Sequence, residues 1–436
     1  MSLRMSPYSS RRSRVWPALL VTGALAFTAA CGGDDDGGSG GSADGGQTTI
    51  EFSWWGSDER HQLTQQAVDA FEAKNPGIKV EVQFSDWDSF YDTLTTQVAS
   101  GDAPDVFTIE IRRLGEFARA GRLADAGSMV ATEGLNSQLL TSGQVDGTQY
   151  AIPTGANTFA LMANTKILAD AGVELPDDSS WTWEDYHALA AQVSEATGED
   201  VYGTQINFND AYLRLFAAQR GEEFYEGTQI GISPETIADW FQTHLDLIGN
   251  GGSPDAALST EVGATSVEQS LIATNTGAMG MWWSNQLGAL TTGSGEDVQL
   301  LQVPKEEGAT TNGMFLQPTM FWAISEQSDK QEAAAKLVDF LVNDPEAGAI
   351  LGSDRGLPMN DAVLSEIRDE LPAADQQSLA FIEEHADSLT APTAYPNGAG
   401  DVPDMLQRYG EEVIFERMTP EQAAEEFLRE ANGVLS

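Results

Sequence analysis

The fold of this chain is decided by residues 48–87, which read TTIEFSWWGSDERHQLTQQAVDAFEAKNPGIKVEVQFSDW. Apolar and polar residues alternate over 49–54 and again over 78–84, which is the period-two pattern of a β-strand. Between the two strands, apolar residues from Leu63 to Phe71 fall on one face of a helix, which ends at Asn75-Pro76-Gly77. This order predicts two parallel strands joined by a helical crossover.

The alternation of strands and helices continues as far as residue 118. A second helix is indicated over 90–98 and ends near Gly101, a third strand covers 104–109, and another helix includes Leu114. We therefore predict an α/β fold with a parallel sheet covered by helices on both faces. Ligands of such sheets bind beyond the carboxyl ends of the strands, which here are residues 54–58, 85–87 and 110–112.

The middle of the chain is richer in helices. Thr182 and Ser233 are predicted N-caps, and residues 206–212 form a polar and aromatic entry into another helix. A buried strand over 277–283 then opens into two tryptophans and the amide of Asn285.

The last third of the chain contains a predicted strand over 319–325 and a helix over 328–341. The final helix is predicted to begin at Thr419, where Thr-Pro-Glu-Gln has the pattern of a cap, and to end at Gly433.

The chain begins with a typical export leader. A basic head with four arginines precedes an apolar run over 15–30 that is too short for a spanning helix, and small residues lead to Cys31. We predict a lipoprotein signal peptide over 1–30 and lipid attachment at Cys31, although Thr28 stands where an aliphatic residue is usual. The alternative is a free or buried thiol. Residues 31–46, rich in Gly, Ser and Asp, are predicted to be a flexible tether.

Charge and composition exclude several kinds of partner. The formal net charge is -45, and a surface this acidic repels nucleic acid and anionic lipid head groups. Cys31 is the only cysteine, so no internal disulfide is expected, and no second long apolar run follows the leader. We expect a monomer on the extracellular face of the cytoplasmic membrane, held there only by its lipid anchor.

Several stretches together resemble the family 1 extracellular solute-binding proteins, the sugar-capturing components of ABC importers, which include the maltose-binding proteins. Each stretch is weakly specific, but their order and spacing extend over most of the chain. They are FEAKNPGIKV (71–80), GDAPDV (101–106), YAIP (150–153), NTKIL (164–168) with Ala171-Gly172, GAM (277–279), WAIS (322–325) with Ala333-Ala334 and Phe340-Leu341, and RGLP (355–358).

The resemblance implies a type II periplasmic-binding-protein fold, with two discontinuous α/β lobes, each a mostly parallel sheet flanked by helices. By this likeness, the first lobe takes 47–155 and 318–356, and the second takes 158–317 and 357–436. Hinge crossovers fall near Gly155-Ala156, Pro318 and Gly356. The implied function is capture of a mono- or oligosaccharide in the interlobe cleft and delivery to the transmembrane subunits of an ABC permease. The alternative ligands are a polyol, a polyamine or a sugar acid.

Sugar recognition needs aromatic faces for the rings and polar groups for the hydroxyls. Trp282 and Trp283 are the main stacking candidates, and strand alternation suggests that at most one of them enters the cleft. The other is then a core residue. Trp55 lies at a strand end, and Met320 takes the place of an aromatic residue that is frequent in the family. Tyr395 is a further candidate.

The polar candidates lie at strand ends, on a second-lobe loop and at the crossovers, where the resemblance places ligand contacts. For Asp58 and Arg355 the alternatives are an ordinary helix-start acid and a surface ion pair, respectively. Arg112 replaces a frequent Asp of the family, so it either pairs with Glu110 or meets an acidic ligand. The polar candidates are Asp58, Asp86, Glu110, Arg112, Asn157, Asn209, Asn285 and Arg355.

No motif indicates catalysis. The sequence has no Gly-x-Ser-x-Gly elbow, no phosphate loop and no dinucleotide-binding glycine pattern, and its four histidines lack metal-ligand spacing. We therefore predict no enzyme activity, no metal and no cofactor. The remaining alternative from another class is a surface glycan hydrolase, because acidic pairs that form only in three dimensions leave no mark in the sequence.

Overall fold

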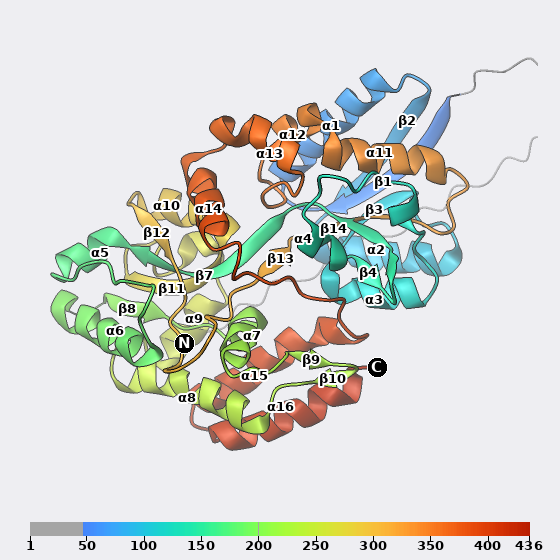
Figure 1. Ribbon diagram of the computed structural model, residues 1–436. Helices are drawn as coiled ribbons and strands as arrows, with labels where there is room; N and C mark the ends of the chain where they lie inside the picture. Colours follow the sequence, from blue (N-terminus) through green and yellow to red (C-terminus); the bar gives the residue numbers. More distant parts are fainter. Residues whose placement is uncertain (1–46, 199) are drawn as a thin grey trace, which may run out of the picture. The chain divides into compact units, whose positions relative to one another are not determined.

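The computed structural model describes residues 47–198 and 200–436. The predicted leader, the predicted lipid attachment at Cys31 and all of the predicted tether (31–46) lie outside the described residues. The described chain contains two five-stranded β-sheets with helices packed around them, so the α/β fold is confirmed (Figure 1). None of the helices in these two ranges is long and apolar enough to cross a bilayer.

The first sheet has the strand order β2-β1-β3-β14-β6. Strands β1 and β2 are parallel, in a register that runs from Thr48 opposite Ile78 to Trp55 opposite Ser85. Strand β3 is parallel to β1 on its other side, so the parallel arrangement predicted for the first 110 residues is confirmed. The strands are β1 (Thr48–Trp55), β2 (Ile78–Ser85), β3 (Val106–Ile109), β6 (Ala151–Pro153) and β14 (Phe321–Ile324).

Strand β14 runs antiparallel to both of its neighbours, β3 and β6. It enters from β13 (Leu316–Pro318) of the second sheet without a crossover helix, so its direction is set by that sheet. The first sheet is therefore mixed at this side rather than wholly parallel.

The helices associated with the first sheet begin and end where local signals predict. Ser57 caps the first of them by accepting a hydrogen bond from the Arg60 amide, and Gly101 ends the second with a left-handed φ of 88°. These helices are α1 (Asp58–Lys74), α2 (Trp87–Ser100), α3 (Ile111–Arg119), α4 (Ser137–Thr141), α11 (Gln331–Asn343), α12 (Pro345–Leu351) and α13 (Asp361–Ile367).

The second sheet differs from the expected mostly parallel arrangement. Its order is β12-β7-β11-β8, with β13 also paired to β7. Only β11 and β8 are parallel, whereas β7 is antiparallel to β11, β12 and β13. Strand β7 continues almost directly from β6, so no helix turns it round. The strands are β7 (Ala156–Asn164), β8 (Tyr202–Gln205), β11 (Gly277–Trp283), β12 (Val298–Leu301) and β13.

The helices associated with the second sheet include the predicted starts at Thr182, Ser233 and Thr419. Thr182 and Thr419 each form a reciprocal capping box with the residue three positions on. These helices are α5 (Thr165–Asp170), α6 (Trp183–Thr197), α7 (Asp210–Gln219), α8 (Pro234–Gly249), α9 (Ala256–Gly263), α10 (Leu287–Ser294), α14 (Ala373–Glu384), α15 (Val402–Ile414) and α16 (Pro420–Val434). Two short hairpins, β4 (Gln144–Val145) with β5 (Thr148–Gln149) and β9 (Tyr225–Glu226) with β10 (Gln229–Ile230), complete the strands.

The prediction that Gly433 ends the last helix is wrong. Helix α16 continues through Gly433 to Val434, and Leu435 is its C-cap. Ser436 exchanges two backbone hydrogen bonds with Asn397, at 3.1 Å each, and Leu435 is buried. The chain end is therefore held by neighbouring structure, and no glycine is needed to stop the helix.

Three crossovers between the sheets meet at one place. Ala156 and Leu357 exchange backbone hydrogen bonds of 2.9 and 3.1 Å, and the Thr319 amide donates to the Gly155 carbonyl at 3.1 Å. Gly356 has a φ of 80°, and a Cβ atom there would lie 2.4 Å from Oγ1 of Thr319. The segments that join the sheets are thus hydrogen-bonded to one another and closely packed.

The lobe boundary expected at residue 357 stays a prediction, and the residues directly after it contact helices of the first sheet. Helix α13 packs on α12, because Gly348 leaves room for the side chain of Val363. The Met359 carbonyl accepts from the Asn136 amide at 2.8 Å, and Asn360 donates to Asn343 at 2.8 Å. The chain therefore stays beside helices of the first sheet until after residue 363, as Figure 1 shows for α12 and α13.

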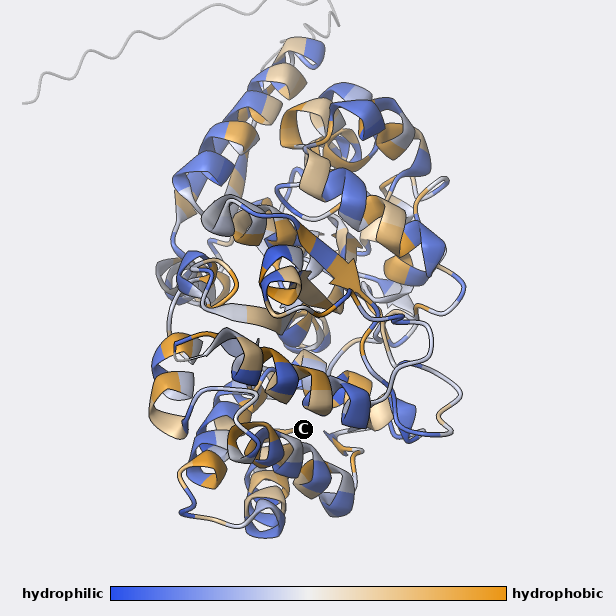
Figure 2. Cartoon of the chain, turned by 90° about the vertical axis from the view of Figure 1, so that its left-hand side faces the viewer, coloured by the Kyte–Doolittle hydropathy of each residue, from blue (hydrophilic) through white to orange (hydrophobic). Residues whose placement is uncertain are grey.

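The core is formed by the strands and the inward faces of the helices. Its largest fully buried side chains include Trp54 and Trp322 in the first sheet and Phe159 in the second. In Figure 2 the helices carry alternating hydrophilic and hydrophobic stretches, as expected of helices with one face packed on a sheet.

Candidate ligand-binding site

A cavity of about 530 Å³ lies between elements of the two sheets. From the first sheet it is lined by Arg112, the second residue of α3. The remaining walls come from the second-sheet side, namely β7, the 205–210 segment, the 262–267 segment, the end of β11 and helix α15. Residues from both sides of the crossovers thus enclose one space.

The topology explains why these segments meet. Arg112 follows the carboxyl end of β3, residues 207–210 follow β8, and Trp282 and Trp283 end β11. Carboxyl ends of strands are where open α/β sheets bind ligands. Of the three strand ends expected to bind ligand, only 110–112 contributes to this cavity, and the ends of β8 and β11 supply much of the remaining lining.

Two tryptophans form the aromatic wall of the cavity. Trp283 packs edge-on against Phe159 at 5.0 Å and Phe315 at 6.0 Å between ring centroids. The indole nitrogen of Trp282 is buried without a hydrogen-bond partner, and no aromatic contact to this ring occurs among the described residues. A Cβ atom at Gly280 would lie 2.8 Å from this nitrogen, so glycine is needed there.

Both tryptophans line the cavity, although strand alternation predicted that at most one would enter it. They are the last two residues of β11, and the chain turns into a short 3-10 helix at Ser284. Both side chains are partly exposed at this bend. Trp283 also packs against two phenylalanines, whereas Trp282 has no aromatic neighbour among the described residues and is the better candidate for stacking on a ligand.

A charged group of three residues lies at one end of the cavity. Nη2 of Arg112 donates to both carboxylate oxygens of Asp210, at 3.1 Å each, and Nη1 lies 3.6 Å from Oε2 of Glu110. Asp210 raises the pKa of Arg112, and burial raises the pKa of Glu110. Arg112 therefore stays positively charged and already faces two carboxyl groups.

The cavity also presents amides. Asn209 caps α7 by accepting a hydrogen bond from the Ala211 amide at 2.8 Å, while its side chain lines the cavity. Asn207 donates to the Met281 carbonyl at 3.1 Å, and Gln407 donates to Glu411 at 2.8 Å. Rings, amides and carboxylates in one space are the groups that recognise sugars.

Four of the predicted site residues therefore line this cavity: Arg112, Asn209, Trp282 and Trp283. Glu110 lies next to it through its contact with Arg112. The others do not line it. Trp55 is buried against Phe90 and Tyr91, Asp58 is exposed in the first turn of α1, Asp86 caps α2, and Asn285 is exposed.

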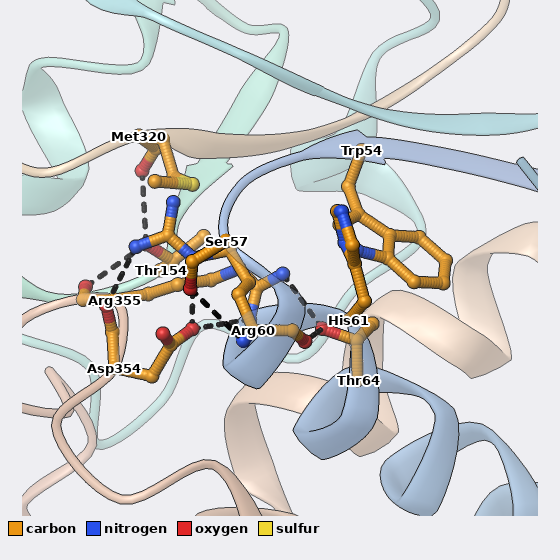
Figure 3. A network of polar contacts seen from close by, with 9 residues as sticks. All are labelled: Trp54, Ser57, Arg60, His61, Thr64, Thr154, Met320, Asp354 and Arg355. Carbon is orange, nitrogen blue, oxygen red and sulfur yellow. Dashed lines mark hydrogen bonds and ion pairs between the residues drawn. The ribbon is translucent and has the colours of Figure 1, made fainter. Parts of the chain in front are cut away.

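The two candidates at the later crossovers, Met320 and Arg355, are buried, and the structure does not bring them to the cavity. Arg355 donates to Oδ2 of Asp354 at 2.9 Å and to Oγ1 of Thr64 at 2.8 Å (Figure 3). Its guanidinium also lies 5.0 Å from the ring centroid of Trp322, and burial lowers its pKa to about 9. Arg355 is therefore part of a buried polar network beside the crossovers and outside the cavity, and its ion pair with Asp354 is not a surface pair.

Asn157 and Tyr395 are also buried. Asn157 donates to Oγ1 of Thr319 at 3.3 Å and so belongs to the crossover region. Tyr395 lines a separate cavity of about 380 Å³, where the guanidinium of Arg214 lies 5.0 Å from its ring centroid.

Two other hollows, of about 650 and 690 Å³, are lined by residues associated with one sheet only. The first lies between α1 and α11, and the second lies around α6, α8 and the 305–307 segment. Neither hollow lies at the carboxyl ends of strands from both sheets. No group of three or more potential metal ligands occurs within 47–198 and 200–436.

Sequence reasoning missed several cavity residues. Asp210 directly follows the predicted Asn209, and its place in the first turn of α7 was a usable signal. Phe159 lies in a wholly buried strand, and Asp404 and Glu411 lie on α15, far along the chain. No local pattern marks these three residues, because only tertiary structure brings them to the cavity.

Comparison with known proteins identifies the class. The family model for bacterial extracellular solute-binding proteins matches residues 55–348, so the chain belongs to this family, as its sequence predicted. The diacetylchitobiose binding protein DasA of Streptomyces coelicolor is 26% identical over 376 residues, which cover 80% of this chain and 83% of that protein.

Solved structures share the fold. The periplasmic solute binding protein ECA2210 from Pectobacterium atrosepticum has a TM-score of 0.79 at 22% identity. A periplasmic oligogalacturonide binding protein from Yersinia enterocolitica, in complex with saturated digalacturonic acid, has a TM-score of 0.75 at 21% identity. Each comparison covers 89% of this chain and 98% of the other. The two-lobed type II binding-protein fold is thus confirmed.

Proposed function

We propose that this solute-binding protein captures a carbohydrate in the cavity between its two sheets and delivers it to an ABC permease. The observation that carries the proposal is the aromatic wall of Trp282 and Trp283 facing the polar groups at Arg112 and Asn209 in a single cavity. The indole ring of Trp282 suits the apolar side of a pyranose, and the polar groups suit its hydroxyls. The diacetylchitobiose ligand named for the relative DasA supports a sugar of one or more units.

Binding is proposed to close two lobes around the sugar. In this proposal the first lobe comprises 47–155 and 318 to about 367, and the second comprises the remainder of the described chain. The hydrogen bonds between Ala156 and Leu357 and between Thr319 and Gly155 support a common hinge at the crossovers. The ligand favours the closed form through contacts that only this form provides.

We further propose that the protein binds without catalysing a reaction, that it acts as a monomer, and that lipid at Cys31 holds it on the extracellular face of the membrane. Membership in a family of extracellular proteins supports the extracellular location, and the pattern of the leader sequence supports the lipid anchor. In this arrangement the residues between Cys31 and the folded part are the linker that lets the binding domain approach the permease.

The proposal is tested by thermal unfolding in a panel of neutral, basic and acidic sugars, with polyols and polyamines for comparison. A sugar that binds only the folded protein raises its melting temperature in a concentration-dependent way. At a sugar concentration of 100 times Kd, binding adds about 2.7 kcal/mol to the free energy of unfolding. A shift with a polyol or polyamine and with no sugar would overturn the carbohydrate proposal. Chromatography of the bound sugar after incubation tests the absence of turnover, and cleaved product would indicate a hydrolase.

A further inference from the structure

The single cation among the described residues that line the cavity is already occupied. Nη2 of Arg112 is bound by both oxygens of Asp210, and its Nη1 faces Glu110. Its Nε is buried without an acceptor. A guanidinium is the usual fork for a ligand carboxylate, because two of its N–H groups match two carboxylate oxygens. Here a protein carboxylate holds that position.

The remaining charges on the wall are negative. Besides Asp210, the described lining carries the carboxylates of Asp404 and Glu411 on helix α15. Three carboxylates and one arginine therefore line this cavity, within a chain whose formal charge is -45. Such a surface repels an anionic ligand both during approach and in the bound state.

We propose that the cavity selects sugars by charge, accepting uncharged and positively charged sugars and rejecting uronic acids, and that Asp210 sets this selection by occupying Arg112. This inference rests on the proposed sugar-binding function and specifies its substrate class. Specificity of this kind comes from a repulsive element against the wrong ligand as well as from contacts to the right one. Asp210 contacts Arg112 from the second-sheet side, so the same ion pair also joins the two sides of the cavity.

The substitution Asp210→Asn tests the role of Asp210, because it removes the charge and keeps the shape. It should release Arg112 to bind a ligand carboxylate. The matched control is Asp361→Asn. Both residues stand directly after an asparagine N-cap in the first turn of a helix, but Asp361 is exposed on α13 and does not line the cavity.

Binding is measured by calorimetry with three disaccharides, namely N,N′-diacetylchitobiose, its deacetylated cationic form and digalacturonate. The neutral and cationic disaccharides are expected to bind the wild type more tightly than digalacturonate does. If the thermal-unfolding panel identifies a longer neutral sugar as the ligand, that sugar replaces the neutral disaccharide in this comparison. Asp210→Asn should gain affinity for digalacturonate by about tenfold or more, and added salt should reduce that gain. Asp361→Asn should behave as the wild type does.

The outcomes separate this inference from the proposed function. If digalacturonate binds the wild type as tightly as neutral sugars do, charge selection is overturned while sugar binding stands. If folded Asp210→Asn gains no affinity for digalacturonate, the role of Asp210 is wrong. If no sugar of any charge binds, the proposed function itself fails. Should Asp210→Asn not fold, the double variant Asp404→Asn with Glu411→Gln is measured instead, since it leaves the Asp210–Arg112 pair intact. This variant should still discriminate against digalacturonate, and loss of that discrimination would assign the selection to helix α15 and overturn the role of Asp210.

Discussion

The side chain of Arg60 binds Asp354 at two points, with Nε 3.0 Å from Oδ2 and Nη2 2.8 Å from the backbone carbonyl. The same carboxylate accepts from Arg355, so one acid serves two arginines next to the crossovers (Figure 3). Helix α1 is thereby linked to the segment that follows α12, and Thr64 completes the network by accepting from Arg355 and donating to the Arg60 carbonyl.

Replacing Asp354 by Asn should lower the free energy of unfolding by about 3 kcal/mol, because it leaves a buried arginine without its counter-charge. Denaturant unfolding measures the change. The control is Asp170→Asn, which removes the partner of exposed Lys166 and should cost less than about 1 kcal/mol. Equal losses in the two variants would mean that the Asp354 network adds nothing beyond a surface pair.

Replacing Gly356 by Ala should destabilise the meeting point of the crossovers. Its φ of 80° costs an L-residue about 1 kcal/mol, and the new Cβ would also press on Thr319 and on the Ala156 carbonyl, 2.9 Å away. Gly308→Ala is the matched control, since Gly308 has a φ of 83° and open space around it. We expect Gly356→Ala to lose about 1–3 kcal/mol more than Gly308→Ala does in denaturant unfolding. Similar losses would show that the crossovers adjust freely.

The stability of the protein should fall on acidification through His244. This side chain is fully buried between the carbonyls of Trp240 and Asn207, at 2.8 and 3.0 Å, and burial lowers its pKa to about 4 although both carbonyls favour the charged ring. Because the folded pKa lies below the unfolded value near 6.5, the unfolded chain binds the proton first. The contribution is complete above pH 6.5 and is lost progressively toward pH 4.

Comparison of the wild type with His244→Gln isolates this effect from that of the many carboxylates. Between pH 7 and pH 5, the wild type should lose about 2 kcal/mol more stability than the variant. Denaturant unfolding at both pH values gives the difference. Parallel losses in the two proteins would mean that His244 does not titrate in this window.

Much of the fold was predictable because its signals are local. Alternation over 78–84, the Thr182 and Thr419 caps and the Gly101 helix end each act within a few residues. The directions of β7 and β14 were not predictable in this way. They depend on how the chain passes from one sheet to the other without a helix, and no short stretch of sequence records that.

The lining of the cavity was predictable where the residue follows or ends a strand, as with Arg112, Asn209, Trp282 and Trp283. Met320 and Arg355, which were placed by resemblance alone, are buried outside the cavity, and a resemblance between sequences does not reveal burial. The cavity residues on helix α15 were not predicted, because nothing in the sequence sets them apart. Asp404 and Glu411 resemble the solvent-exposed acids found throughout so acidic a chain.

The proposed lipid anchor at Cys31 can be tested independently of the folded part. Cys31→Ser should leave the leader able to direct export and remove the thiol that we propose carries the lipid, so sugar-binding protein should appear in the medium. Cell fractionation with immunodetection measures the distribution, and a conservative change in the tether, Ser42→Ala, is the control. Retention of Cys31→Ser at the membrane to the wild-type extent would contradict lipid anchoring at this residue.

Trp282 and Trp283 should respond differently to truncation, because only Trp283 has aromatic packing partners among the described residues. Trp282→Ala should weaken sugar binding by about 1–3 kcal/mol, the scale of a lost stacking anchor, and should lower the free energy of unfolding less than Trp283→Ala does. Trp283→Ala should also lower the free energy of unfolding, since it removes contacts to Phe159 and Phe315. Calorimetry with the sugar and denaturant unfolding separate the two effects, and Phe415→Ala, an exposed aromatic outside the cavity, is the control. Unchanged affinity in both tryptophan variants would remove the aromatic wall as the basis of binding and transfer that role to the polar side of the cavity.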